Sequence, residues 1–174
     1  MKMIIVENFF DNFENIKNEF KKIKLYNIEE FNKNFDRNET WPGFRSEVLD
    51  VENPFLFNLL IREIFLKFGK ETFYNNNIIV KSHIHLRLKD DDEKDWIHKD
   101  EGFKTLIIYL SETNLNSGTC LYDDNENLTT TVNFVQNRAF LFDCKTNHKS
   151  MSNYGKNIEN GRLTLNCFIK LATD

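Results

Sequence analysis

The stretch WIHKDEGFKTLIIYL (96–110) joins two metal-competent side chains to an apolar run. His98 and Asp100 stand at positions i and i+2, and the run from Phe103 to Leu110 has the β-branched and aromatic residues typical of a strand. In an extended chain, side chains two residues apart leave the same face. The imidazole and the carboxylate are therefore expected to point the same way, at the entrance to a strand.

The composition favours one ordinary folded domain spanning residues 1–174. Hydrophobic residues make up 40% of the 174 residues and aromatic residues 14%, with 17 Phe among them. A chain of this length can bury one substantial core but is short for two. The net charge of −4 and a pI near 5.6 give no overall attraction to phosphate backbones or anionic lipids. Nucleic acid and membranes are therefore not expected partners.

The cysteines and the chain start predict a cytoplasmic protein of the producing or host cell. Three cysteines are an odd number, without CxxC spacing, and each lies among apolar residues: Cys120, Cys144 and Cys167. Free thiols fit a reducing compartment. No apolar run approaches membrane-spanning length, and the apolar part of MKMIIVENFF is too short for a signal peptide.

The first part of the chain shows helical periodicity. Apolar residues at steps of three or four predict a first amphipathic helix: Phe9, Phe13, Ile16, Phe20 and Ile23. A second helix is expected to have Asn53 as its N-cap, Pro54 at its first position and apolar residues through Phe68, and to end at Gly69. Between the two helices, the Pro42-Gly43 pair predicts a turn.

From Asn77 onward, short β-branched and aromatic runs alternate with turn-prone segments. We expect strands at 78–88, 103–110, 119–122, 128–135, 139–142 and 162–171. Helices followed by strands, without strand–helix alternation, predict two helices packed on an antiparallel sandwich or barrel.

A metal site at His98 and Asp100 needs a third ligand. His148 lies in the polar residues that follow the run 139–142, a position suited to the rim of a barrel. Two imidazoles and one carboxylate form the facial triad of non-haem Fe(II) oxygenases, which leaves coordination positions open. The pattern therefore predicts an iron site.

The segment NGRLTLNCFIK (160–170) predicts an anion site. In an extended chain Arg162, Thr164, Asn166 and Phe168 share one face, while apolar residues occupy the other. A guanidinium fork with a hydroxyl two residues later can bind a carboxylate in two-pronged fashion. A dicarboxylate cosubstrate would fit such a site.

Four further residues are candidate substrate contacts. His85 and Arg87 alternate with apolar residues, together with His83, so that the three either line a cavity beside the metal or face solvent. Trp96, just before the triad, either walls the substrate pocket, which we favour, or caps the core. Arg45 in WPGFR is a candidate substrate contact or an ordinary loop charge.

The acidic run from Asp90 to Asp95 has two interpretations. The simpler one is a solvated loop. Because the run lies between two strands that would frame the site, it could also act as a mobile lid.

The ordered motifs of the chain resemble those of the Fe(II)- and 2-oxoglutarate-dependent oxygenases. Within them, the chain is most similar to the prolyl-4-hydroxylase-like group and its short phage-type members. Residues 77–170 carry the resemblance well and the N-terminal helices loosely. The motifs are HxD with a distal His, Pro42-Gly43-Phe44-Arg45, Tyr109-Leu110-Ser111, Ser117-Gly118-Thr119 and Asn160-Gly161-Arg162-Leu163-Thr164.

The resemblance implies a fold and an activity. The fold would be mainly β, with a helical support region (1–76) on the larger sheet of a double-stranded β-helix, or jelly-roll, core (77–174). The activity would use O₂ and 2-oxoglutarate to hydroxylate a C–H bond of a prolyl residue or an amino acid, with release of succinate and CO₂. The substrate would be a small molecule or a peptide.

The resemblance also implies site roles. Fe(II) would bind to the triad His98, Asp100 and His148. The distal carboxylate of 2-oxoglutarate would pair with Arg162, with help from Tyr109 and Thr164. Collagen-type prolyl hydroxylases use Lys where this chain has Arg162, so the prolyl substrate transfers less directly than the cosubstrate. Related halogenases lack the carboxylate that Asp100 supplies, which favours hydroxylation.

Two other functions compete with this one. A non-catalytic jelly-roll that binds a ligand or a protein would use the metal structurally, with a closed coordination shell. It would need neither Arg162 nor Thr164. A zinc hydrolase would need a general base near the triad. Glu101, at i+1 from Asp100, is expected to point to the opposite face.

Overall fold

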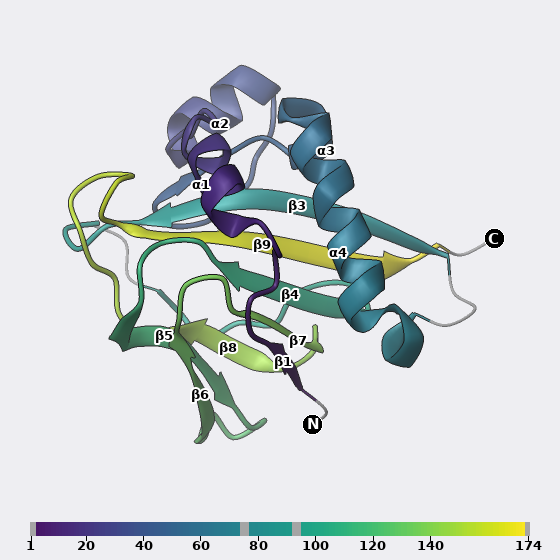
Figure 1. Ribbon diagram of the computed structural model, residues 1–174. Coiled ribbons are helices and arrows are strands. Elements are labelled where there is room, and N and C mark those ends of the chain that lie inside the picture. Colours follow the sequence, from purple (N-terminus) through teal and green to yellow (C-terminus); the bar gives the residue numbers. More distant parts are fainter. Residues whose placement is uncertain (1–2, 74–76, 92–94, 173–174) are drawn as a thin grey trace.

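The computed structural model describes residues 3–73, 77–91 and 95–172, in which the helices and two short strands precede the remaining strands (Figure 1). The helices are α1 (Phe13–Lys21), α2 (Ile28–Phe35), α3 (Leu49–Glu52) and α4 (Pro54–Thr72). The strands are β1 (Ile4–Val6), β2 (Phe44–Arg45), β3 (Ile78–Arg87), β4 (Lys104–Tyr109), β5 (Asn114–Tyr122), β6 (Leu128–Phe134), β7 (Ala139–Asp143), β8 (Asn147–Ser150) and β9 (Arg162–Leu171).

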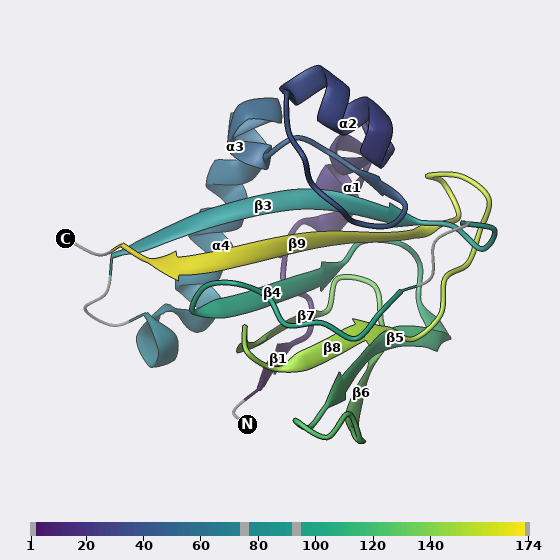
Figure 2. The same ribbon diagram turned by 180° about the vertical axis from the view of Figure 1, so that it is seen from behind.

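The strands form two antiparallel sheets. The larger sheet has the order β1-β7-β4-β9-β3-β2, and the smaller one has the order β6-β5-β8. Strands β3 and β9 pair along their whole length, from Ile78 opposite Leu171 to Arg87 opposite Arg162. Helices α1 and α4 lie across one face of the larger sheet, in front of it in Figure 1 and behind it in Figure 2. This is the mainly β, jelly-roll architecture with N-terminal helices that the sequence predicts.

Alternation along β9 decides which side chains reach each face of the larger sheet. Leu163, Leu165, Cys167 and Ile169 are buried in one cluster with apolar residues of α1 and α4. Each buried side chain of leucine size stabilises the folded state by about 1.5–3 kcal/mol. Because the helices pack on this face and side chains alternate along the strand, Arg162 and Thr164 face the interior between the sheets.

A second apolar cluster closes the interior between the sheets. It joins residues of the larger sheet to residues of the smaller one: Ile107, Tyr109, Leu121, Val132, Phe134, Phe140 and Phe142. This cluster fills one part of the space between the sheets, beside the polar side chains described below.

Both predicted helices form, but their bounds differ from the prediction. The backbone N–H groups of Phe9 and Phe10 donate to Asn137 O and Oδ1, each at 2.9 Å, so helix α1 begins only at Phe13. Asn53 caps α4 as expected, accepting from Leu56 N at 3.1 Å. The prediction that α4 ends at Gly69 is wrong, because the helix continues to Thr72. A glycine inside a helix destabilises it by only about 1 kcal/mol relative to alanine, and the packing of neighbouring side chains can offset this amount.

Helix α2 is absent from the prediction, although its start carries a readable signal. Asn27 Oδ1 accepts from Glu30 N at 2.9 Å, and Glu30 Oε2 accepts from Asn27 N at 3.4 Å. This reciprocal capping box satisfies backbone donors at the first turn. The helix is short, which makes its apolar period difficult to recognise in the sequence.

Cys120, Cys144 and Cys167 are all free and buried. Within the described ranges, none of the helices combines the length and the apolar character needed to span a bilayer.

Candidate metal centre

A pair of backbone hydrogen bonds places the two predicted histidine ligands side by side. His98 N donates to His148 O at 3.1 Å, and His148 N donates to His98 O at 2.9 Å. Asp100 N then donates to Cys144 O at 2.9 Å, which continues the pairing beyond His98. The loop before β4 is therefore held against β8 and the turn that precedes it.

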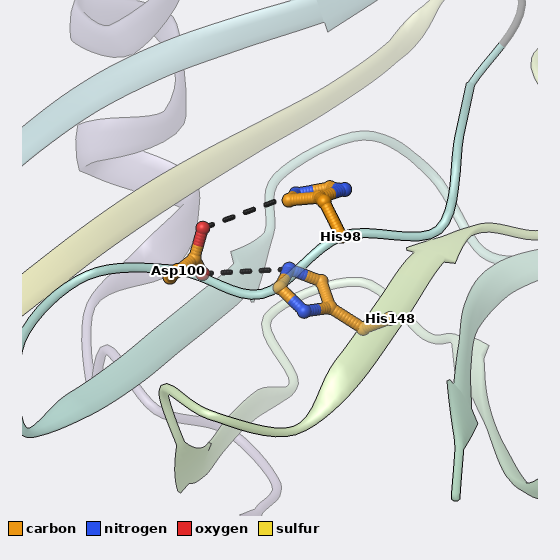
Figure 3. Close-up of side chains that lie close together, drawn as sticks. All are labelled: His98, Asp100 and His148. Atoms are coloured by element: carbon orange, nitrogen blue, oxygen red, sulfur yellow. Dashed lines mark ion pairs between the residues drawn. The ribbon is translucent and has the colours of Figure 1, made fainter. Parts of the chain in front are cut away.

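This pairing directs the three predicted ligand side chains toward one point (Figure 3). One ligand atom from each of His98, Asp100 and His148 lies within 4.8 Å of the others. His148 Nε2 is 3.4 Å from Asp100 Oδ2, and His98 Nε2 is 3.9 Å from Asp100 Oδ1. Among the described residues, this is a group of donors with a spacing that could hold one metal ion.

The Nδ1 atoms of both imidazoles are held by hydrogen bonds to backbone carbonyls. His98 Nδ1 lies 3.0 Å from Trp96 O, and His148 Nδ1 lies 3.0 Å from Thr146 O. Since a carbonyl only accepts, each Nδ1 carries the proton and each Nε2 presents a lone pair when the ring is neutral. Burial lowers the pKa of His148, which favours the neutral ring.

The donor set consequently fits a cation. Two Nε2 lone pairs and a carboxylate are all acceptors, and they repel one another unless positive charge lies between them. Fixing Nδ1–H on a carbonyl is the usual way in which proteins orient a metal-binding histidine. Two imidazoles and one carboxylate on one side of an ion match the donor set of non-haem Fe(II) sites.

Asp100 has a supporting contact that the sequence analysis missed. Thr105 Oγ1, on β4, donates to Asp100 Oδ2 at 2.7 Å. Thr105 is buried and stands at i+5 from Asp100, so it gives no short-range signal in the sequence. Its hydroxyl holds the carboxylate in the orientation that faces both imidazoles.

The triad lines a cavity of about 250 Å³ between the sheets. Arg162, Thr119 and Asn166 also line it, from β9 and β5. The predicted substrate contacts His85, Arg45 and Trp96 line it as well, whereas Arg87 is not among the lining residues. Three of the four candidate substrate contacts thus share one cavity with the triad.

Arg162 is almost fully buried, with 3% of its surface exposed. Its Nη2 donates to Gly118 O at 3.1 Å and to Thr119 Oγ1 at 3.4 Å, and its guanidinium lies over the Phe134 ring at 5.6 Å. The Nε–H group has no hydrogen-bond partner in the structure. Buried donors are normally paired, so this edge of the guanidinium fits an anionic ligand.

Tyr109 and Thr164 are buried close to the cavity but are not among the residues that line it. The Tyr109 hydroxyl donates to Val132 O at 2.9 Å and lies 3.0 Å from Thr119 Oγ1. Burial raises the pKa of Tyr109 to about 12. Thr164 Oγ1 donates to His85 O at 3.4 Å. Their roles toward a cosubstrate stay predictions, whereas Thr119, within the SGT motif, does line the cavity.

His83, His85 and Arg87 face the interior, not solvent. They pair in register with Asn166, Thr164 and Arg162, and all three are buried. Burial lowers the pKa of His83 to about 4 and holds the pKa of His85 well below its ordinary value. Neutral imidazoles therefore lie beside β9 on the side that faces the interior.

The acidic run is tied to the protein where the structure describes it. Asp91 Oδ2 lies 3.2 Å from Arg87 Nη1, and Asp95 Oδ2 lies 3.4 Å from Arg87 Nη2. Both carboxylates are largely buried, with 9% and 18% of their side chains exposed, so these two residues do not belong to a solvated loop. The possible lid includes residues 92–94, which lie outside the described residues.

No family model matches the sequence, and no curated protein matches it significantly. Solved structures match the fold over almost the whole chain. An oxidoreductase of the 2OG-Fe(II) oxygenase family from Burkholderia pseudomallei has a TM-score of 0.67 at 11% identity, with 97% of this chain and 84% of that chain covered. A prolyl-4-hydroxylase from Pseudomonas putida has a TM-score of 0.64 at 12% identity, with 98% and 93% covered.

A third match carries bound ligands. HygX from Streptomyces hygroscopicus, solved with nickel and 2-oxoglutarate bound, has a TM-score of 0.68 at 11% identity, with 97% of this chain and 82% of that chain covered. The chain therefore has the fold of 2OG-Fe(II) oxygenases, prolyl-4-hydroxylases among them, as its motifs imply. At such identities the likeness concerns the fold alone.

Proposed function

We propose that the protein is an Fe(II)- and 2-oxoglutarate-dependent dioxygenase that hydroxylates a C–H bond of a small-molecule or peptide substrate, with a prolyl residue or an amino acid as the first candidates. One observation carries the proposal. Three acceptors, from His98, Asp100 and His148, converge within 4.8 Å in the same cavity as Arg162. A cation satisfies the acceptors, and a carboxylate satisfies the arginine.

The triad would hold Fe(II) by His98 Nε2, His148 Nε2 and an Asp100 oxygen. Ligands on one side of the ion leave its other positions for cosubstrates. When bound there, Fe(II) supplies the oxidation chemistry, in which O₂ and 2-oxoglutarate give succinate, CO₂ and one oxygen atom for the substrate C–H bond. The Asp100 carboxylate, fixed by Thr105, favours hydroxylation over halogenation.

Arg162 would bind the distal carboxylate of 2-oxoglutarate through its unpaired Nε edge. Thr119 lies beside this edge and lines the cavity, while Tyr109 and Thr164 would support the pair from behind. The buried guanidinium is held in place by Gly118 O, so the site is organised before the ligand arrives.

The proposal is tested by anaerobic titration of the purified protein with Fe(II) and 2-oxoglutarate. We expect a weak visible metal-to-ligand charge-transfer band that requires both components. Arg162→Ala should weaken the band, and Lys170→Ala, at an exposed position on the same strand, should leave it intact. The weakening should be at least tenfold in 2-oxoglutarate affinity, because a charged hydrogen bond contributes about 1.5–3 kcal/mol.

The opposite result has a clear meaning. If Fe(II) binds but the band is absent, the cosubstrate step fails and a jelly-roll binding module with a structural metal becomes the better account. A zinc hydrolase has little support, because the Glu101 side chain is 91% exposed and lies 3.8 Å from Lys170 Nζ. That position leaves it unsuited as a general base for the triad.

A further inference from the structure

Arg45 is a second arginine of the cavity, and its backbone is rigidly placed. It pairs with His85 in the β2–β3 register and exchanges two hydrogen bonds with Tyr26, each at 2.9 Å. The preceding turn is anchored as well, because His85 Nε2 lies 2.7 Å from Pro42 O. Strand β2 therefore presents the Arg45 side chain to the cavity from a fixed position.

The Arg45 guanidinium is largely buried and lacks a close partner. Its side chain is 14% exposed, its centre lies over the Trp41 ring at 4.8 Å, and its Nε–H group has no hydrogen-bond partner. The nearest carboxylate oxygen that pairs with it, Glu39 Oε2, is 4.0 Å away, at the limit of an ion pair. Stacking on Trp41 restrains the plane of the guanidinium, so its unpaired edge is ready for a planar anion.

The charge of Glu39 is shared among three cations. Its carboxylate lies 3.4 Å from Arg37 Nη1 and 4.0 Å from Lys81 Nζ, in addition to its contact with Arg45. Glu47 contributes a further carboxylate to Arg37, at 3.6 Å, but not to Arg45. The positive charge of Arg45 is thus only partly balanced by the protein.

Formal charges in the cavity lead to the same conclusion. In the proposed enzyme, Fe(II), the Asp100 carboxylate, the 2-oxoglutarate dianion and the Arg162 guanidinium sum to zero. Asp95, the other acid that lines the cavity, pairs with Arg87 and accepts from Asn153 Nδ2 at 2.7 Å. Lys149 also lines the cavity but is only half-buried. Arg45 therefore remains as a buried cation whose one pairing carboxylate, Glu39, is shared with two other cations, which is costly unless a ligand supplies an anion.

We propose that Arg45 binds a carboxylate of the primary substrate, and that this substrate is a free carboxylic acid of amino-acid size. The proposal rests on the proposed function, which assigns Arg162 to 2-oxoglutarate. The size follows from the cavity, whose volume of about 250 Å³ is below the usual range of ligand pockets, about 300–1,000 Å³, and must also admit the cosubstrate. A carboxylate pairs with a guanidinium edge through two parallel hydrogen bonds.

The test uses the anaerobic complex of the protein with Fe(II) and 2-oxoglutarate. The ligands are proteinogenic L-amino acids, their carboxamides, N-acetyl amino acids and N-acetyl amino acid amides. Binding is read from the charge-transfer band and from tryptophan fluorescence, since both tryptophans of the chain, Trp41 and Trp96, line the cavity. We expect at least one free acid to bind tenfold or more tightly than its carboxamide.

Variants assign that preference to Arg45. Arg45→Gln should reduce the affinity for the acid by about tenfold to a hundredfold and leave that for the carboxamide unchanged, while Arg45→Lys should restore part of it. Arg37→Gln is the matched control, because Arg37 shares Glu39 but does not line the cavity. The 2-oxoglutarate band should persist in all three variants.

Several outcomes would overturn the proposal. These are a carboxamide or N-acetyl amide that binds as tightly as the acid, an acid preference that survives in Arg45→Gln, or a panel with no binder although the band is present. A preference for N-acetyl acids over free amino acids would point to a peptide C-terminus and overturn the free-acid assignment. If the unaltered protein shows no charge-transfer band with Fe(II) and 2-oxoglutarate, the proposed function itself is rejected. Failure of the Arg45 proposal is therefore distinguishable from failure of the proposed function.

Discussion

His98 and His148 form an isolated antiparallel bridge, with two backbone hydrogen bonds of 3.1 and 2.9 Å between segments that are distant in sequence. Their rings lie 4.3 Å apart between centroids. The bridge aligns two imidazoles whose Nδ1 atoms both face carbonyls, and it leaves both Nε2 atoms directed at Asp100. Backbone pairing, more than side-chain packing, therefore assembles this site.

Replacing Asp100 should remove iron binding and coupled turnover together. Asp100→Ala takes away the only carboxylate of the triad, and the loss should exceed the ~10–100-fold effect of removing a supporting residue. Anaerobic Fe(II) titration and succinate production measure the two effects. Asp124→Ala, at a side chain that is 89% exposed, is the control. Turnover at the unaltered rate in Asp100→Ala would reject the iron site.

Thr105 should tune the metal site without touching the metal. Thr105→Val removes the hydroxyl that donates to Asp100 Oδ2 at 2.7 Å but keeps the shape of the side chain. We expect Fe(II) affinity to fall by ~10–100-fold, measured by competition with a chelator under anaerobic conditions. Thr105→Ser, which keeps the hydroxyl, should retain most of the affinity. Equal affinities in the two variants would contradict the supporting role.

Tyr109→Phe separates a cosubstrate role from a structural one. The hydroxyl lies beside Thr119, which also contacts Arg162, so its loss should weaken 2-oxoglutarate binding about five- to tenfold. Fe(II) affinity should not change. The band titration measures the first quantity and a chelator competition the second. If only the denaturation midpoint shifts, Tyr109 serves the fold alone.

His83 should make the metal-free protein less stable in acid. Burial lowers its pKa from 6.5 to about 4, so as the pH falls through 6.5 the unfolded chain takes up a proton that the folded chain resists until about pH 4. Stability is therefore fully present above pH 6.5 and is lost between pH 6.5 and 4, by up to about 3 kcal/mol from this residue.

Urea denaturation of the metal-free protein at pH 7 and pH 4.5 measures this effect. His83→Asn keeps a donor that can reach Ser46 O, which His83 Nδ1 approaches at 3.0 Å, but cannot titrate. The variant should show a smaller loss of stability between the two pH values than the unaltered protein. If the variant loses as much stability between pH 7 and pH 4.5 as the unaltered protein does, His83 is not the group responsible.

Much of the fold and of the donor set can be predicted from the sequence, because both rest on local pattern. Period-two alternation in 162–171 assigns Leu163 and Leu165 to the helical side and Arg162 to the interior, as the structure has them. The i, i+2 spacing of His98 and Asp100 likewise predicts that they share a face, and the cap at Asn53 and Pro54 locates the start of α4. In each case a few neighbouring residues carry the signal.

Only the tertiary structure decided which distant residues contact the side chains in these patterns. The bridge between His98 and His148 and the contact of Thr119 with Arg162 join residues that are distant in sequence. The start of α1 and the length of α4 also depended on distant partners or on packing that outweighed a glycine. Such contacts follow from strand order and register, which bring together segments whose local sequences contain no record of one another.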